Sequence, residues 1–131
     1  MEKRIHDRVI FLGKQDKVNE KLATADVMLL PSQLESFGLV ALEAMACQVV
    51  PITTNVGGLP EVVEHGKTGF MSKVGDVEEM ARYAVDLLSD DAKLKQMGSE
   101  GRTAAQGRFC STRIIPLYEK FYRGVLERAS E

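Results

Sequence analysis

The chain has 131 residues, of which 44% are hydrophobic and 27% charged, and its formal net charge is −2. This length is enough for one domain with one core, and the composition is that of a globular domain rather than a disordered segment. Acidic and basic residues are interspersed without a basic stripe, which makes nucleic acid and anionic membranes poor candidate partners. No apolar run approaches the length of a membrane span, and the charged N-terminus lacks the apolar stretch of a secretion signal.

The number and spacing of the cysteines further limit the kinds of site that the chain can form. Cys47 and Cys110 are too few for a disulfide framework, and no Cys or His cluster has the spacing of metal ligands. We therefore expect a reducing, cytoplasmic setting and a protein without a bound metal. Cys47 ends an apolar helical stretch, where we expect a buried small hydrophobic residue rather than a nucleophile.

Short apolar runs rich in β-branched residues alternate with longer runs of helical period. This pattern predicts an α/β fold, a Rossmann-like parallel sheet with helices on both faces. Strands are expected at residues 9–12, 26–31, 49–53 and 70–73. The run at 26–31 is apolar without alternation, as in a central strand covered on both faces. Helices are expected at residues 18–25, 39–47, 60–65, 76–88, 90–107 and 114–126, with His65 ending the third and glycines weakening the fifth.

The last predicted helix, residues 114–126, carries an apolar stripe that needs a partner surface. The partner is either this domain's own core or a surface outside it, and we favour the first because terminal helices commonly dock locally. Four strands are few for an open α/β sheet, and the chain begins after the strands that normally form its centre. We therefore expect residues 1–131 to be a single partial domain of a longer enzyme.

The stretch Glu35-Ser-Phe-Gly-Leu-Val-Ala-Leu-Glu43 places one carboxylate in the loop after a buried strand and a second inside the next helix. Eight residues of helix span about 12 Å, wider than the roughly 5–9.5 Å between carboxylates that hydrolyse glycosidic bonds. The spacing instead suits a long ligand with hydroxyl groups at both ends. Between the carboxylates, Gly38 permits close approach, and free N–H groups at the helix start favour a phosphate. A nucleotide sugar presents its groups in this order.

This motif is followed by Gly57-Gly-Leu-Pro-Glu61 and His65-Gly-Lys-Thr-Gly-Phe70. The combination resembles family 4 of the retaining glycosyltransferases, which have the two-lobed GT-B fold, and the resemblance runs from about residue 9 to the C-terminus. It implies the C-terminal, donor-binding lobe of an enzyme that transfers sugar from a nucleoside diphosphate without a required metal. The small-molecule acceptor would be bound by the N-terminal lobe of the same enzyme.

The resemblance also implies roles for individual residues. Glu35 is the candidate catalytic residue, since it would hold and orient the donor sugar, and Glu43 would bind the ribose hydroxyls. The donor-binding set also includes Gly13, Lys14, Ser36, Phe37, Gly38 and Leu39, with Gly13 and Lys14 next to the base. One departure is Cys47-Gln-Val-Val-Pro51, where the helix end lacks the family's usual glycine.

Within the family, Gly13-Lys-Gln-Asp16, Glu35-Ser-Phe-Gly-Leu39 and the stretch 54–61 most resemble the enzymes that join N-acetylglucosamine to L-malate in bacillithiol synthesis. This implies a UDP-sugar donor. The family's diphosphate-binding Arg and Lys precede the region covered here, so we expect the chain alone to be inactive. A nucleotide-sugar-binding module without catalysis remains the alternative. Phosphoacceptor and dinucleotide-binding domains are disfavoured, because clustered aspartates and a Gly-x-Gly-x-x-Gly motif are missing.

Overall fold

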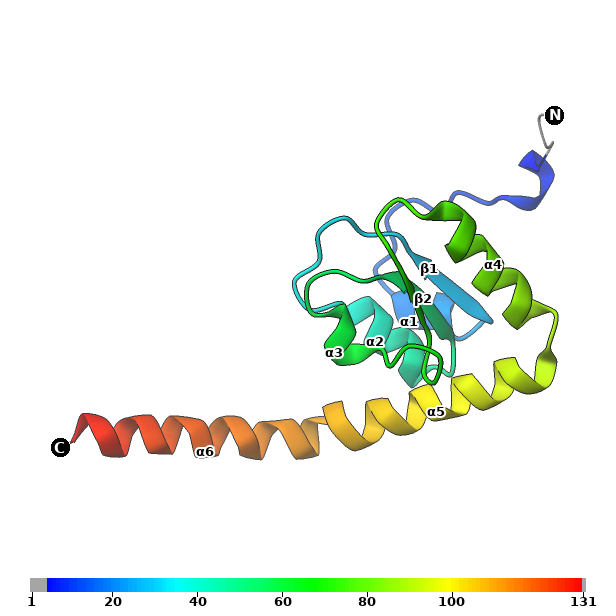
Figure 1. Ribbon diagram of the computed structural model, residues 1–131. Helices are drawn as coiled ribbons and strands as arrows, with labels where there is room; N and C mark the ends of the chain where they lie inside the picture. Colours follow the sequence, from blue (N-terminus) through cyan, green and yellow to red (C-terminus); the bar gives the residue numbers. More distant parts are fainter. Residues whose placement is uncertain (1–4, 131) are drawn as a thin grey trace.

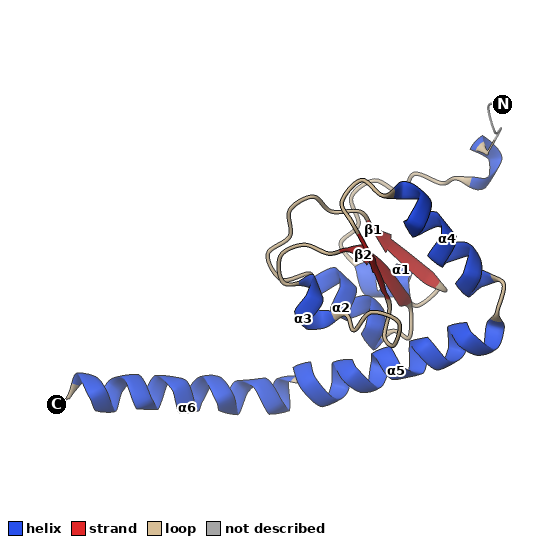
Figure 2. Cartoon of the chain, in the orientation of Figure 1, coloured by secondary structure: helices blue, strands red, loops and turns tan. Residues whose placement is uncertain are grey.

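The computed structural model describes residues 5–130, which form a parallel sheet with helices on both of its faces (Figures 1 and 2). The sheet has three strands in the order β1-β2-β3: β1 is Val27–Leu30, β2 is Val50–Thr54 and β3 is Phe70–Ser72. The helices are η1 (His6–Arg8), α1 (Val18–Leu22), α2 (Leu39–Ala46), α3 (Leu59–Val62), α4 (Val77–Leu88), α5 (Asp91–Phe109) and α6 (Ser111–Ala129). The predicted α/β fold is confirmed.

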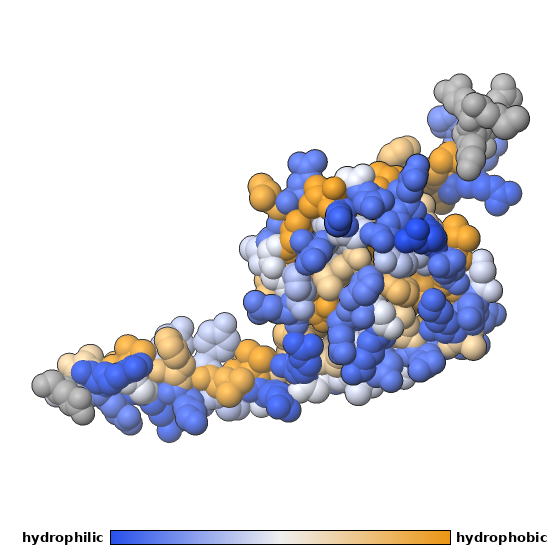
Figure 3. All heavy atoms as spheres, viewed as in Figure 1, coloured by the Kyte–Doolittle hydropathy of each residue, from blue (hydrophilic) through white to orange (hydrophobic). Residues whose placement is uncertain are grey.

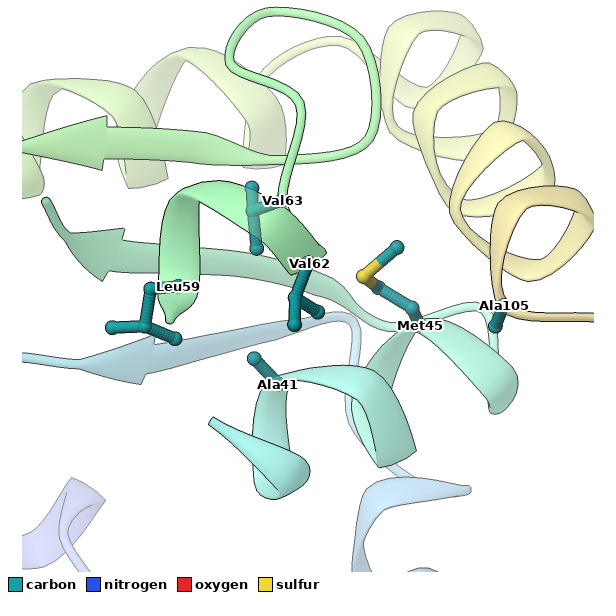
Figure 4. Close-up of a cluster of buried hydrophobic side chains, with 6 residues drawn as sticks. All are labelled: Ala41, Met45, Leu59, Val62, Val63 and Ala105. Atoms are coloured by element: carbon teal, nitrogen blue, oxygen red, sulfur yellow. The ribbon is translucent and has the colours of Figure 1, made fainter. Parts of the chain in front are cut away.

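The central strand β2 is buried along its whole length, as expected for a parallel strand covered on both faces. On one face the sheet packs against α4 and α5 through Val50, Ile52, Phe70, Met80, Leu87 and Met97. The core on the other face joins α2, α3 and α5 and consists of Ala41, Met45, Leu59, Val62, Val63 and Ala105 (Figure 4). These two cores hold the strand ends, and the loops that leave them, in a fixed arrangement.

The predicted strand at residues 9–12 is wrong. Ile10 and Phe11 are 82% and 94% exposed, and the segment is not in a strand. A strand needs a neighbour for its backbone hydrogen bonds, and none of the described residues pairs with this segment. The predicted central position of β1 is also wrong, because β1 pairs only with β2 within residues 5–130 and Leu29 is 52% exposed.

His65 does not end a helix, as the sequence suggested, because α3 already ends at Val62. Instead, Nδ1 of His65 accepts a hydrogen bond of 2.9 Å from the backbone N–H of Met71. The ring also lies edge-on to Phe70 and Tyr83, at 5.6 and 5.7 Å between centroids. His65 therefore fixes the start of β3 against α4.

The terminal helix α6 extends away from the body of the domain (Figure 1), so the expectation that it closes the local core is wrong. It contributes no buried residue to the described structure. Cys110 has extended backbone angles, which break the helix between α5 and α6. Leu117, Phe121 and Leu126 are 59%, 61% and 67% exposed, and hydrophobic surface follows the helix in Figure 3. No helix within residues 5–130 is long and apolar enough to cross a membrane.

Helix α5 packs closely on the end of α2. Gln48 follows α2 in the left-handed region, with φ of 63°, at the position where the sequence lacks the usual glycine. A β-carbon on Gly98 of α5 would lie 2.5 Å from the backbone oxygen of Gln48. Gly98 is therefore needed for the close approach of the two helices, rather than being a weak point of α5.

Gly98→Ala should destabilise the domain by about 1–3 kcal/mol, because the added methyl group overpacks this contact. Gly107→Ala is a matched control in the same helix, since a β-carbon there meets nothing within 4 Å. The control should instead gain about 0.5–1 kcal/mol of helix propensity. Urea denaturation of both variants measures the difference, and equal shifts of the same sign would contradict the packing argument.

Candidate functional site

The candidate site lies where β1 and β2 end. The chain leaves β1 into a loop that leads to α2, and it leaves β2 into a turn that leads to α3. The two exits are neighbours, because β1 and β2 are parallel and Leu30 is paired with Thr53. Ligands of open α/β sheets bind at the carboxyl ends of the strands. The 35–38 loop, which carries Glu35 and Gly38, therefore stands at the edge of the sheet where a ligand is expected.

The N-terminus of α2 has no side-chain cap. Gly38 is its N-cap residue. The first helical hydrogen bonds run from Ala41 and Leu42 to the carbonyl oxygen of Gly38, so the N–H groups of residues 38–40 precede this ladder. Such groups, together with the helix dipole, attract phosphate.

Glycine is required at position 38 for two reasons. The residue has φ of 87°, a region that side chains other than glycine rarely adopt. A β-carbon there would also collide with Cδ2 of Leu59, which is fully buried in the core. The conformation that opens the helix N-terminus is thus fixed by packing against α3.

The two carboxylates of the motif have different surroundings. Glu35 is half-buried in the loop, and its Oε2 accepts a hydrogen bond of 3.3 Å from Oγ of Ser32. Glu43 is exposed on α2, four residues after Leu39, and both residues are on the exposed surface of that helix. Each carboxylate retains acceptor positions for ligand hydroxyl groups.

The 56–58 turn after β2 supports the 35–38 loop. The N–H of Gly58 donates a hydrogen bond of 3.0 Å to the carbonyl oxygen of Ser36. Gly57 has φ of 55°, and a β-carbon on it would collide with the carbonyl oxygen of Glu35. The sequence did not predict that this turn supports the main chain of the 35–38 loop. The pair of adjacent glycines was the signal that two backbones meet here.

Phe37 anchors the other side of the loop. Its ring is half-buried and meets Phe109 of α5 edge-on, with 6.0 Å between centroids. Beside it lies a cavity of about 510 Å³, lined by Phe37, Leu39, Leu42, Phe109, Ile114 and Tyr118. None of these side chains carries a charge.

Gly13 and Lys14, the predicted base contacts, are in an exposed loop before α1. This loop is ordered locally by the side chain of Gln15, which donates to the carbonyl oxygens of Leu12 and Lys14 at 2.6 and 3.1 Å. No hydrogen bond among the described residues joins Gly13 or Lys14 to the 35–38 loop. Their role stays a prediction, whereas Glu35, Ser36, Phe37, Gly38, Leu39 and Glu43 share one loop and helix.

The sequence and the geometry together identify the class of protein. Residues 1–104 match the family described as Glycosyl transferases group 1, and the chain belongs to this family. It is 52% identical over 122 residues to N-acetyl-alpha-D-glucosaminyl L-malate synthase from Bacillus anthracis. That alignment covers 93% of this chain and 32% of the relative. The chain thus spans about one third of the length of this relative.

Solved structures confirm the fold assignment. Sucrose-phosphate synthase from Thermosynechococcus elongatus superposes with a TM-score of 0.87 at 34% identity, covering 93% of this chain and 31% of that protein. HepE from Anabaena, solved in complex with UDP, superposes with a TM-score of 0.88 at 29% identity, covering 92% and 33%. The domain described here corresponds to about one third of each of these proteins.

Gly57→Ala should disrupt the loop more than its backbone strain alone explains. Gly75→Ala is the matched control, because Gly75 also has a positive φ, 83°, but a β-carbon on it meets nothing within 4 Å. The control should lose about 1–2 kcal/mol of stability from the left-handed backbone. Gly57→Ala should lose at least about 1 kcal/mol more, from the collision with Glu35. Thermal or urea unfolding measures both, and equal losses would show that the turn does not support the loop.

Proposed function

We propose that this chain forms the donor-binding part of a retaining glycosyltransferase, and that its ligand is a nucleoside diphosphate sugar, UDP-N-acetylglucosamine. Glu35 holds the hydroxyl groups of the transferred sugar, and Glu43 holds those of the ribose. The start of α2 between them accepts the diphosphate. Gly13 and Lys14 contact the base, and the main chain of residues 36–39 borders the sugar and diphosphate.

The observation that carries this proposal is the order of groups along one short segment. An uncapped helix N-terminus is opened by Gly38, with one carboxylate before it and one after it. Backbone N–H groups at a helix start suit phosphate oxygens, whereas carboxylates suit pairs of sugar hydroxyls. Within nine residues the segment thus offers a group for hydroxyls, then groups for phosphate, then a second group for hydroxyls. This order matches a ligand with hydroxyl groups at both ends and negative charge in the middle.

The comparisons support a particular ligand within this class. The solved HepE structure was determined with UDP, which supports a uridine nucleotide. The relative from Bacillus anthracis is named as a glucosaminyl L-malate synthase, and its 52% identity supports N-acetylglucosamine as the sugar and L-malate as the acceptor. Donor binding is then the role of this chain, whereas turnover requires this chain together with the N-terminal lobe of the enzyme.

Loss of either carboxylate should weaken binding in a different way. Glu43→Ala should lower the affinity for both UDP and UDP-N-acetylglucosamine by roughly tenfold or more, because hydrogen bonds to a charged group contribute about 1.5–3 kcal/mol. Glu35→Ala should leave UDP affinity unchanged and lower the affinity for the sugar nucleotide alone. Isothermal titration calorimetry of this chain with the two ligands separates these effects.

Glu78→Ala is the control for the loss of one negative charge, since Glu78 is an exposed residue in the first turn of α4. It should bind both ligands as the unmodified chain does. If Glu43→Ala binds UDP like the control, the ribose role of Glu43 is refuted. If the unmodified chain binds neither ligand, the proposed function of this chain is wrong.

A further inference from the structure

We infer that Ser32 and Thr54 are positioning residues for donor-sugar recognition, acting on Glu35 through a relay of hydrogen bonds from the end of β2. The inference rests on the proposed function and names what sets the orientation of its sugar-binding carboxylate. Neither residue belongs to the stretch from Glu35 to Glu43.

The first step of the relay joins two strand ends. Thr54 is the last residue of β2 and is 2% exposed. Its hydroxyl group donates a short hydrogen bond to the carbonyl oxygen of Ser32, which is 22 residues earlier in the chain. Since β1 and β2 are parallel neighbours, this bond fixes the course of the loop just after it leaves β1.

The second step fixes the side chain. Oγ of Ser32 donates to Oε2 of Glu35 at 3.3 Å, and both residues are half-buried. A glutamate side chain on a loop samples many rotamers when it is free, and a held rotamer lowers the entropy lost when a ligand binds. One hydrogen bond leaves further acceptor positions on the carboxylate for sugar hydroxyls.

The main chain of the same loop is held independently by the 56–58 turn, through the hydrogen bond from Gly58 to Ser36 and the contact of Gly57 with Glu35. The backbone of Glu35 is thus supported by the turn that follows β2, and its side chain by Ser32, whose carbonyl oxygen is held by Thr54 at the end of β2. Such a supporting shell, with rotamers fixed before the ligand arrives, is what precise binding sites require.

A positioning role predicts a change that a merely structural role does not. Ser32→Ala should leave the affinity of this chain for UDP unchanged, because the ribose and diphosphate contacts do not involve Glu35. It should lower the affinity for UDP-N-acetylglucosamine by roughly three- to tenfold, the range for one lost hydrogen bond. The measured quantity is the affinity for UDP-N-acetylglucosamine divided by the affinity for UDP.

Three further variants make the test specific. Ser32→Thr keeps the hydroxyl donor, so its ratio of affinities should stay close to that of the unmodified chain. Thr54→Val removes the first step of the relay and should lower the ratio in the same direction, with a non-additive effect in the double variant. Ser99→Ala, on the exposed surface of α5, removes a hydroxyl away from the site and should change nothing.

The outcomes distinguish failure of this inference from failure of the proposed function. If Glu35→Ala lowers the ratio but Ser32→Ala does not, the relay is refuted and the sugar role of Glu35 stands. If the unmodified chain binds neither ligand, the proposed function fails and the inference fails with it. Thr54 is buried, so Thr54→Val is the variant that risks unfolding the domain. Ser32 is partly exposed, and Ser32→Ala decides the question without Thr54→Val.

Discussion

The contact between two main chains at the carboxyl end of the sheet is the constraint on which this site depends. The 35–38 loop and the 56–58 turn approach so closely that Gly57 has no room for a β-carbon, and Gly38 has none because the side chain of Leu59 fills the space. Both glycines also have positive φ, so space and conformation restrict the same positions. The consequence is a loop whose backbone is fixed by the protein and whose N–H groups and carboxylates remain for a ligand.

Much of the fold follows from local patterns in the sequence. β2 is a short apolar run and is a buried strand, and α4 begins after Asp76, whose side chain accepts from the N–H of Glu79 as a helix cap should. The failures have a common cause. Residues 9–12 have the pattern of a strand and α6 has an apolar stripe, but within residues 5–130 the first finds no neighbour to pair with and the second no core beneath it. Local pattern indicates what a segment can form, whereas pairing and docking depend on surfaces that the pattern does not contain.

The candidate site also has one part that the local sequence predicted and another part that it did not. Glu35, Glu43 and the glycine between them lie within nine residues, and this stretch together with the motifs that follow it predicted one ligand-binding segment. The groups that support this segment come from the end of β2, and Thr54 reaches Ser32 across 22 residues. Ser32 and Glu35 are three residues apart in the same loop, so the hydrogen bond between them is local in sequence. The contribution of Thr54 required the strand order.

The central claim is that a uridine diphosphate is bound at the start of α2. The most direct test is a series of two-dimensional ¹H–¹⁵N NMR spectra of this chain during titration with UDP. If UDP is bound at the start of α2, the largest shift changes fall on the amides of Gly38, Leu39 and Val40, and the amides of α6 do not change. Saturable binding whose shift changes avoid the start of α2 would show that the nucleotide is bound elsewhere.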